Sequence, residues 1–344
     1  MRVKALDYHN YNEWDKFVDQ SPQGDIFCYS WWLEAITKSN FKILAIFENN
    51  EIVAGIPVAY DAQNKANEPP LTRTLGVLYK NNDYASARKQ ISTERKWLSE
   101  LLKHLPLDDF VQMSAHHNFT DWLPFRWKGF KQTTRYTYII SYENRTINDL
   151  WQKLELETKR VIRRVQEYGI RVELADDFDL VYKFESMSYE RQGLKFRIPL
   201  SELKILDDAI KEKGNRVILK AIDNSNRIHA VLYVANNKKS AYALLSGSDP
   251  ELRKKGGHTL VMWEAVKYFY DKVNYFNLGG SDIERIEAHL KGFGGTLTPY
   301  FHIYNEKLMW KRNDIRFHFS ETRFHLNEIL KIVINKISHA SRRN

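Results

Sequence analysis

Two glycine-rich segments in the second half of the chain have the residue types expected of a ligand-binding turn. In the first, residues 246–259, glycines allow the backbone to approach an anion closely, and three consecutive cations add positive charge. A helix that begins after these glycines would direct unpaired backbone N–H groups toward the same anion. The predicted contacts are Ser246, Gly247, Arg253, Lys254, Lys255, Gly256, Gly257 and His258. The alternative is a basic, glycine-capped helix start that binds no ligand.

The second segment, residues 277–282, ends in a serine and an aspartate. Its adjacent glycines, Gly279 and Gly280, again indicate close approach of the backbone to a ligand. Ser281 and Asp282 have side chains that can orient an incoming amine. Lys291 follows on the next predicted helix, where it can bind a phosphate or the leaving group. Tight-turn geometry alone is the alternative explanation for the glycines.

Basic residues form a stripe on a helix predicted over residues 148–168. Pairs spaced four apart lie on one face of a helix, so the four cations would form a single broad surface. They are Lys159, Arg160, Arg163 and Arg164. The stripe is either a clamp for phosphate or carboxylate, which makes these residues candidate substrate contacts, or a solvated helix face.

A fourth cluster lies at the end of another predicted helix, where an aromatic and basic loop begins. Loops held by rigid elements carry function more often than helix interiors do. We therefore predict substrate contacts from Arg191, Gln192 and Arg197. Tyr189 and Glu190 join Asp282 as candidate general bases, and a group of the substrate is the alternative. A helix cap followed by an ordinary connector is the alternative.

Two conspicuous features lead to no predicted site. His116 and His117 have no carboxylate or third ligand at a spacing that would bind a metal, so we interpret them as structural or surface residues. Cys28 is the only cysteine, and a nucleophilic role would need a paired base that the sequence does not indicate. We therefore expect no metal site and no disulfide.

The composition bounds the classes of protein to which the chain can belong. With 344 residues it is long enough for two domains, and 43% hydrophobic residues provide material for two cores. The formal net charge of +9 favours anionic partners, such as phosphorylated substrates, nucleic acid or an acidic membrane surface, without choosing among them. The first residues lack the apolar stretch of a signal peptide, and no run of about 18 apolar residues occurs. We expect a cytoplasmic protein without a transmembrane segment.

Hydrophobic periodicity predicts the elements that must position these residues. In the second half, strands are expected at 170–174, 216–222, 227–235, 240–246, 275–278 and 296–304, and helices at 148–168, 178–192, 201–213, 258–273 and 283–291. In the first half, strands are expected at 2–6, 42–48, 51–60, 72–78, 109–114 and 131–140, and helices at 11–19, 29–38, 90–104 and 119–127. Both halves give the same order: strand, two helices, three strands, helix, strand, helix, strand.

Local identities support a duplication. Residues 46–54 align with 222–230 without a gap, and residues 128–130 repeat the Lys-Gly-Phe of 291–293. Agreement in element order and in sequence predicts two copies of one α+β domain, each a mixed, mostly antiparallel sheet flanked by helices. The expected parts are an N-terminal domain at 1–145, a C-terminal domain at 146–310 and a helical tail at 311–344 that packs back on the body.

The motifs in their order resemble those of the Fem family and its acetyltransferase-like relatives, in which two GNAT domains are fused in one chain. They are Ser21, Pro22, Phe27, Trp32 and Leu33; Lys159, Arg160, Arg163 and Arg164; residues 191–194; residues 247–250 before Gly256 and Gly257; and residues 277–281 with 291–295. The resemblance covers nearly the whole chain and adds Trp32 to the expected substrate contacts. It implies that an acyl donor enters a gap between the fourth and fifth strands of the second half. The first half, whose equivalent loop at 79–90 lacks the glycines, would be a degenerate copy that shapes the substrate cleft.

The resemblance also implies an acyltransferase, in which a neutral amine attacks the donor carbonyl and backbone N–H groups near the fourth strand stabilise the oxyanion. Fem proteins transfer amino acids from aminoacyl-tRNA to peptidoglycan precursors, and relatives use acyl-CoA, often in polysaccharide pathways. The helical-arm insertion of some Fem transferases has no counterpart in residues 141–260. We therefore expect N-acylation with acyl-CoA, such as acetyl-CoA, as the donor, and we keep aminoacyl-tRNA as the alternative. A non-catalytic binding module is the third alternative, because His258 departs from the usual donor-loop pattern.

The expected acceptor is a phosphorylated, nucleotide-linked or lipid-linked precursor of the cell envelope. A lipid-linked acceptor would suit peripheral contact with the inner face of the membrane, for which the basic, amphipathic tail is a candidate.

Overall fold

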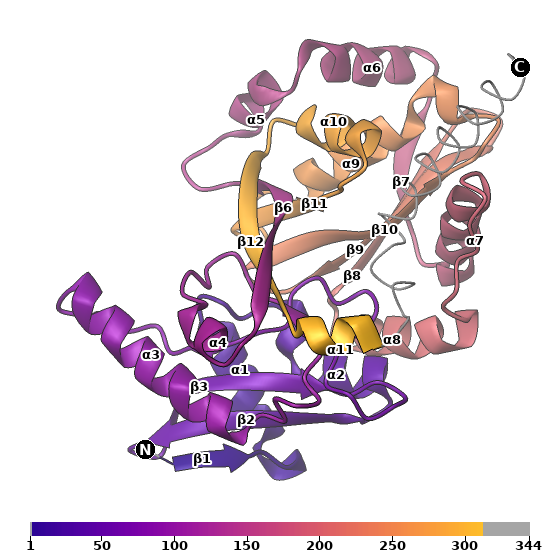
Figure 1. The fold of residues 1–344 in the computed structure, drawn as a ribbon. Coiled ribbons are helices and arrows are strands. Elements are labelled where there is room, and N and C mark those ends of the chain that lie inside the picture. Colours follow the sequence, from indigo (N-terminus) through magenta and orange to yellow (C-terminus); the bar gives the residue numbers. More distant parts are fainter. Residues whose placement is uncertain (1, 312–344) are drawn as a thin grey trace, which may run out of the picture.

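The computed structural model describes residues 2–311, which form two sheets covered by helices (Figure 1). The smaller sheet has the strand order β1-β2-β3-β4. The larger sheet has eight strands in the order β5-β12-β6-β11-β10-β9-β8-β7. Among the paired strands named here, only β10 and β11 run parallel. The predicted α+β class with mixed, mostly antiparallel sheets is confirmed.

The elements of the first half are β1 (Arg2–Ala5), α1 (Tyr11–Gln20), α2 (Ser30–Thr37), β2 (Phe41–Glu48), β3 (Glu51–Ala59), β4 (Leu78–Tyr79), α3 (Ala87–His104), β5 (Gln112–Ser114), α4 (Leu123–Trp127) and β6 (Lys131–Ser141), with short 3-10 helices η1 (Tyr8–Asn10) and η2 (Ile26–Cys28). The elements of the second half are α5 (Ile147–Lys153), α6 (Leu156–Glu167), β7 (Arg171–Ala175), α7 (Phe178–Glu190), α8 (Leu200–Glu212), β8 (Arg216–Ile222), β9 (Ile228–Asn236), β10 (Ser240–Ser248), η3 (Arg253–Lys255), α9 (Gly257–Phe269), β11 (Tyr275–Gly279), α10 (Glu284–Lys291), β12 (Thr296–Tyr304) and α11 (Glu306–Lys311). The order matches the predicted one in both halves.

Two predicted elements differ from the structure. The helix expected over 148–168 is two helices, because Leu154 adopts an extended conformation and the turn at 292–294 packs against the break. There the backbone N–H of Glu155 donates to the carbonyl of Gly292 at 3.0 Å. The strand expected over 72–78 is reduced to the two residues of β4, and the preceding segment is a loop that faces the second half.

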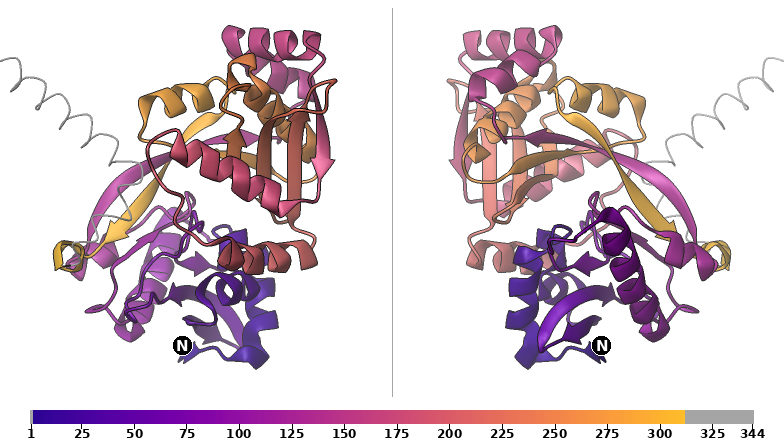
Figure 2. Two further views of the ribbon diagram at one scale, coloured as in Figure 1. Left: turned by 90° about the vertical axis from the view of Figure 1, so that its right-hand side faces the viewer. Right: turned by 90° about the vertical axis from the view of Figure 1, so that its left-hand side faces the viewer.

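The two halves exchange their last strands. β6, from the first half, pairs with β11, the fifth strand of the second half, and β12 pairs with β5, the fifth strand of the first half. β6 and β12 also pair with each other over nine residue pairs, from Thr296 opposite Ile139 to Tyr304 opposite Lys131. Figure 2 shows these two strands running together between the halves. Backbone hydrogen bonds as well as packing therefore join the two halves of the chain.

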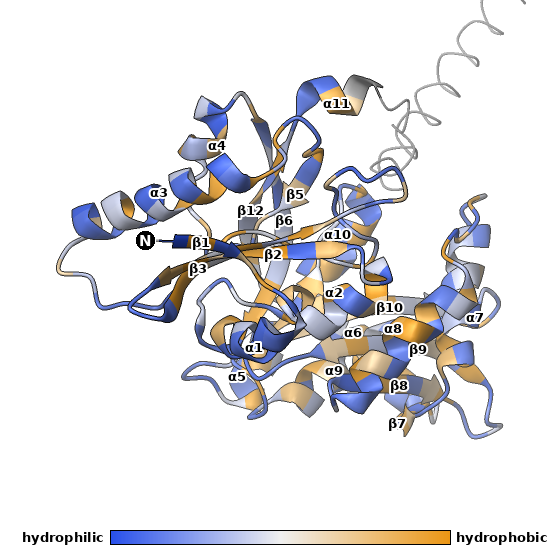
Figure 3. Ribbon diagram, turned by 90° about the horizontal axis from the view of Figure 1, so that it is seen from below, coloured by the Kyte–Doolittle hydropathy of each residue, from blue (hydrophilic) through white to orange (hydrophobic). Residues whose placement is uncertain are grey.

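Three hydrophobic clusters fill the interior of the described part of the chain, and one of them packs the helices of the first half against the sheet and helices of the second. The shared cluster brings the aromatic side chains of α1, η2 and α2, such as Trp14, Phe27 and Trp32, against α7, α8 and the strands β8–β10. Of the other two, one lies under α5, α6 and α9, and one lies under α3 and includes Ile303 of β12. In Figure 3 most of α3 is coloured hydrophilic or neutral, and its buried residues, Trp97, Leu98, Leu101 and Leu102, form the face that covers the core.

A buried polar cluster connects η2 to β10 and β11. The carboxyl of Asp25 accepts hydrogen bonds from the Tyr242 hydroxyl and from Ser240 Oγ, the latter at 3.0 Å. His116 Nε2 lies 3.1 Å from the Tyr275 hydroxyl, and its ring is buried, which agrees with the structural interpretation of this residue. Burial raises the pKa of the Cys28 thiol to about 12, so this side chain is an unreactive core residue.

Candidate active site

The strands β10 and β11 separate partway along their length. They pair from Ser240 opposite Tyr275 to Tyr242 opposite Asn277, and the pairing then stops although β10 continues to Ser248 and β11 to Gly279. The backbone edges of the two strands diverge beyond this point. This is the gap between the fourth and fifth strands of the second half in which the donor is expected.

A cavity of about 620 Å³ fills this gap, and we call it the inter-strand cavity. Its walls come from α7 and the following loop, from β10, α9, β11 and α10, and from the first-half loop at 70–73. Its lining includes Arg73, Glu185, Tyr189, Gln192, Arg197, Leu244, Ser246, His258, Gly279, Gly280, Ser281 and His289. Both halves of the chain therefore contribute to one site.

Glu185 is the carboxyl group that α7 places in this cavity. It was not among the site residues predicted from the sequence. Its Oε2 accepts a hydrogen bond of 2.9 Å from the backbone N–H of Ser246 on the diverging edge of β10. Burial raises the pKa of Glu185 to about 7, although the Ser246 N–H and the charge of Arg73 act in the opposite direction. A carboxyl group that titrates near neutrality can accept a proton from an amine. A signal was present in the sequence, because Glu185 falls on the same face of α7 as the buried Phe178 and Val181.

Two histidines form a hydrogen-bonded chain on the other side of Ser246. His258 Nε2 lies 3.1 Å from Ser246 Oγ, and His258 Nδ1 lies 3.1 Å from His289 Nε2. Burial, His289 and the charge of Arg191 lower the pKa of His258 to about 3, and burial lowers the pKa of His289. Both rings are therefore neutral at pH 7, and they can orient the Ser246 hydroxyl without bringing charge into the cavity.

Three arginines converge beside the cavity. Arg191 follows α7, Arg253 lies in η3, and Arg285 lies in α10, where its Nη2 donates to Gln192 Oε1 at 3.3 Å. Burial together with the like charges of Arg253 and Arg285 lowers the pKa of Arg191. Mutual repulsion of this kind is relieved by a bound anion, so the cluster is suited to a phosphate group. Arg191 and Arg253 were predicted for different sites, the first for the substrate and the second for the donor, and the structure brings them together.

The glycines of the donor loop are explained by packing. Gly256 has a φ of +88°, and a Cβ there would lie 2.6 Å from Val161 of α6. A Cβ on Gly257 would lie 2.6 Å from the Cβ of His229. Close packing alone therefore explains why these positions are glycine. The predicted close approach of a ligand is not required to explain them. Lys254 and Lys255 are exposed on η3, and Gly247 packs against the backbone of Phe184.

The glycine pair after β11 has a similar cause. A Cβ on Gly280 would lie 1.8 Å from the carbonyl oxygen of Tyr136, so only glycine allows β6 to pass at this point. Gly280 and Ser281 still line the inter-strand cavity. Asp282 and Lys291 are exposed and lie outside its lining, so the structure does not bring these two predicted catalytic residues to the reacting centre.

The basic stripe on α6 also lies outside the cavity lining. Lys159 Nζ donates to the carbonyl of Gln152 at 2.9 Å, Arg160 pairs with Glu157 at 3.6 Å, and Arg163 lies over the Trp151 ring at 5.6 Å. Arg164 is exposed. The placement matches the solvated helix face that was the alternative explanation of the stripe.

The predicted substrate contacts after α7 have mixed outcomes. Tyr189, Gln192 and Arg197 line the inter-strand cavity, and the Tyr189 ring packs against Phe196 with centroids 5.1 Å apart. The prediction that Trp32 contacts the substrate is wrong, because its side chain is completely buried in the shared core. Its indole N–H donates to Thr72 Oγ1 at 3.1 Å and so supports the loop at 70–73 from behind.

Residues 2–311 contain no group of three or more histidine, cysteine, aspartate or glutamate side chains placed to hold a metal ion. Over the same part of the chain, every helix is too short or too polar to span a bilayer. The predicted helical tail at 311–344 lies essentially outside the described residues.

Residues 152–287 match the family described as "Acetyltransferase (GNAT) domain". The crystal structure of FemX superposes with a TM-score of 0.66 at 14% identity, covering 90% of this chain and 99% of FemX. The chain has a tandem GNAT fold of the Fem type. L-PGS from Bacillus licheniformis has the same arrangement, with a TM-score of 0.53 at 9% identity over 88% of this chain and 93% of that protein. A conserved protein of unknown function from Bacteroides thetaiotaomicron superposes with a TM-score of 0.51 at 11% identity, over 89% of this chain and all of the other.

The search of curated proteins returned no significant match. Residues 152–287 therefore form a GNAT acetyltransferase-type domain, within a fold that this chain shares with FemX. The tandem GNAT fold also accounts for the site, because the matched residues 152–287 contain α7, β10, η3, α9 and β11. Most of the residues that line the cavity therefore lie within the matched segment.

Proposed function

We propose that this protein is an N-acyltransferase that moves an acyl group from acyl-CoA to an amine of a cell-envelope or polysaccharide precursor. The observation that carries the proposal is the position of Glu185, a half-buried carboxyl group whose pKa is raised to about 7, at the point where β10 and β11 diverge. A non-catalytic binding module would have no need to keep a carboxyl group at this cost in free energy.

Charge and volume support a position of the donor in the inter-strand cavity. Arg191 and Arg253 would hold phosphate groups of coenzyme A, and the N-terminus of α9 at Gly257 would add unpaired backbone N–H groups. The thioester end would extend between the diverging strands toward Glu185. A cavity of about 620 Å³ is within the range that small-molecule ligands occupy.

The proposed reaction transfers one acyl group and moves one proton. The amine nitrogen attacks the thioester carbonyl carbon, a C–N bond forms, the C–S bond breaks, and coenzyme A leaves as a thiolate that takes a proton from solvent. The proton lost by the amine goes to the carboxylate of Glu185. The backbone N–H of Ser246 is engaged by Glu185, so the Ser246 hydroxyl, oriented by neutral His258, is the proposed donor to the oxyanion.

A thiol-release assay tests the proposal. Purified protein is incubated with acetyl-CoA and a panel of amino sugars and peptide amines, and free coenzyme A is measured with a thiol reagent. Amine-dependent release in the wild type that is lost in Glu185→Gln supports the proposal. Release that does not depend on any amine, or that is unchanged in Glu185→Gln, contradicts it.

The second candidate function is Fem-type transfer of an amino acid from aminoacyl-tRNA to a peptidoglycan precursor. It is favoured by the superposition on FemX over nearly the whole of both chains. The same arginine cluster would then contact the phosphates near the 3′ end of the tRNA. Incubation with tRNA charged with radiolabelled amino acids separates the two donors, since the label moves to an acceptor only if the tRNA is a substrate.

The acceptor side of the proposal rests on the contribution of the first half. The loop at 70–73 closes the inter-strand cavity opposite α7, and this arrangement would let an extended phosphorylated, nucleotide-linked or lipid-linked acceptor lie between the halves. The proposed reaction takes place in the cytoplasm, with peripheral contact at the inner face of the membrane if the acceptor is lipid-linked. Co-sedimentation with anionic vesicles tests that contact.

A further inference from the structure

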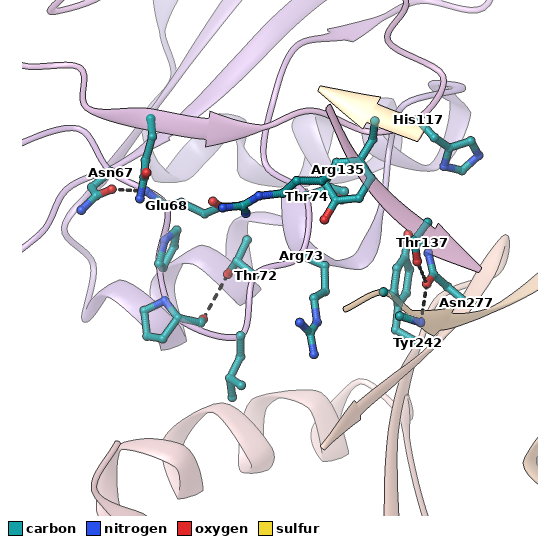
Figure 4. A pocket seen from close by; sticks show the side chains of 17 residues that line it. Asn67, Glu68, Thr72, Arg73, Thr74, His117, Arg135, Thr137, Tyr242 and Asn277 are labelled. Carbon is teal, nitrogen blue, oxygen red and sulfur yellow. Dashed lines mark hydrogen bonds between the residues drawn. The ribbon is translucent and has the colours of Figure 1, made fainter. Parts of the chain in front are cut away.

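A smaller, more polar pocket opens beside the inter-strand cavity, and we call it the side pocket. It has a volume of about 240 Å³ and lies between the first-half loop at 67–74, β6, and the end of β11 (Figure 4). The loop at 70–73, Gly279 and Gly280 line both spaces. A molecule in the side pocket is therefore adjacent to one in the inter-strand cavity.

The side pocket has more positively than negatively charged side chains in its lining. Arg73 and Arg135 line it, and Glu68 is the only carboxyl residue that lines it. Burial raises the pKa of Glu68 to about 7, while Arg135, the Ser114 hydroxyl and Arg73 act in the opposite direction. The Ser114 hydroxyl donates to Glu68 Oε2 at 3.1 Å. The pocket thus carries a net charge of at least one positive unit, which favours an anionic ligand.

Arg73 has no carboxylate partner within ion-pair distance among residues 2–311. Its one hydrogen bond runs from Nη2 to the carbonyl of Leu244 and is long, at 3.4 Å. Arg216, by contrast, lies 2.7 Å from the carboxylate of Asp207. Figure 4 shows Arg73 extending into the open space of the pocket. Its guanidinium is therefore available to a ligand.

Asn277 supplies a second donor whose orientation is fixed. Its Oδ1 accepts hydrogen bonds from Thr137 Oγ1 at 2.6 Å and from the backbone N–H of Gly279 at 2.8 Å (Figure 4). The amide nitrogen, Nδ2, therefore points the other way. In the described part of the chain no protein acceptor contacts it. The residue is 5% exposed and lines the side pocket. An amide donor that lines a pocket and has no protein acceptor can donate to a ligand oxygen.

We propose that the side pocket binds an anionic group of the acceptor, a carboxylate or a phosphate, through Arg73 and the side-chain amide of Asn277. The inference rests on the proposed function, because it assigns the other end of the acceptor, its amine, to the inter-strand cavity beside Glu185. The acceptor class is then an amine that carries a separate anionic group, and a neutral amine of the same length is a poor ligand.

Arg73 also links the two spaces electrostatically. Its positive charge lowers the pKa of Glu185 in the inter-strand cavity as well as that of Glu68 in the side pocket. An anion paired with Arg73 offsets that charge at Glu185. The carboxylate of Glu185 consequently becomes a stronger base when an anionic acceptor is in place than when the site is empty.

Calorimetric titration with defined probes tests the proposal without requiring turnover. The probes are a series of ω-amino carboxylates of increasing chain length, the ω-aminoalkyl phosphates of matching length, and the corresponding neutral ω-amino amides. They are titrated into the full-length wild type and into Arg73→Gln, Arg73→Lys and Arg126→Gln. Arg126 is an exposed arginine of α4 outside both pockets, so Arg126→Gln is the matched control for the loss of one surface charge.

The expected result is that the best anionic probe binds the wild type at least about tenfold more tightly than its neutral amide, as one charge-assisted hydrogen-bonded pair provides. Arg73→Gln is expected to abolish this preference, Arg73→Lys to retain part of it, and Arg126→Gln to leave it unchanged. A preference for carboxylate over phosphate, or the reverse, identifies the anion. Equal binding of charged and neutral probes, no binding of any probe, or a preference that survives in Arg73→Gln overturns the proposal.

The titration and the thiol-release assay fail independently. A preference for anionic probes that depends on Arg73, without transfer from any donor, supports the side pocket and contradicts the proposed reaction. Transfer to amines without regard to their charge supports the reaction and contradicts the side pocket.

Discussion

Glu185 combines two properties that are separately common and that together support its proposed role as the general base. It is held by the backbone N–H of Ser246 on the diverging strand, and burial raises its pKa to about 7. Asp282 and Lys291, which sequence spacing favoured, are exposed and lie outside the cavity lining. The difference arises because spacing along the chain identifies turns, whereas the position of a helical side chain depends on how the whole helix packs. The charged position on the apolar face of α7 is the local signal that would have selected Glu185.

Replacing Glu185 by glutamine is expected to lower kcat/KM at pH 8 by a factor of about 10² to 10⁴, the usual contribution of a general base. In the wild type, kcat/KM should rise with pH through about 7, because only the deprotonated carboxyl accepts a proton. Steady-state kinetics from pH 5.5 to 9 would measure both effects. Glu190→Gln is the matched control, since Glu190 ends the same helix, is exposed, and lies outside the cavity lining. A wild-type pH profile retained in Glu185→Gln would remove Glu185 from this role.

The same substitution has a predictable effect on stability. The pKa of Glu185 is higher in the folded protein than its ordinary value of 4.5, so the folded state binds more protons than the unfolded state between about pH 4.5 and 7. The contribution of Glu185 to stability therefore falls as the pH rises through this window. Glu185→Gln should be more stable than the wild type at pH 8 and show less of this advantage at pH 4.5. Urea unfolding at the two pH values measures the difference, and a variant less stable at pH 8 would contradict the raised pKa of this carboxyl.

The arginine cluster leads to a prediction about donor affinity. Arg191→Gln or Arg253→Gln should raise KM for the donor about tenfold or more with little change in kcat, because each arginine would contact phosphate groups remote from the reacting carbonyl. Arg164→Gln, on the exposed stripe of α6, provides the comparison and should leave KM unchanged. An equal loss in all three variants would indicate a general effect of surface charge and not a phosphate site.

At the scale of elements, the sequence predicted most helices and strands because their hydrophobic periodicity and turn residues are strong. The prediction from the sequence failed where tertiary contacts determine the local structure. Leu154 interrupts a continuous helical pattern only because the turn at 292–294 packs there. The exchange of β6 and β12 could not be predicted at all, since the last strands of the two halves follow similar Lys-Gly-Phe turns and either could pair with either fifth strand.

The junction between η2 and β10 is a second test at this scale. Tyr242→Phe removes a hydroxyl donor from the buried carboxyl of Asp25 and should destabilise the protein by about 1–3 kcal/mol. Tyr268→Phe is the control, because no hydrogen bond of the Tyr268 hydroxyl is present in the described part of the chain. Equilibrium urea unfolding of the three proteins gives the comparison. Equal stability of Tyr242→Phe and the wild type would show that the buried cluster does not hold the halves together.

At the scale of the whole molecule, the two halves share a hydrophobic core and exchange strands. Neither half can unfold without exposing apolar surface and unpaired strand edges of the other. We therefore expect a single cooperative unfolding transition, with far-ultraviolet circular dichroism and tryptophan fluorescence giving the same midpoint in urea. Two separate transitions, one for each half, would contradict the structural unity of the molecule.

The placement of the acyl donor between β10 and β11 is the central claim, and thermal stabilisation by acetyl-CoA tests it most directly. A ligand that binds only the folded state raises the melting temperature, and at a concentration of about 100 times Kd it adds about 2.7 kcal/mol of stability. Acetyl-CoA is expected to raise the melting temperature of the wild type and of Arg164→Gln, and to have little effect on an Arg191→Gln, Arg253→Gln double variant. No shift in the wild type at saturating acetyl-CoA, or an undiminished shift in the double variant, would contradict the account.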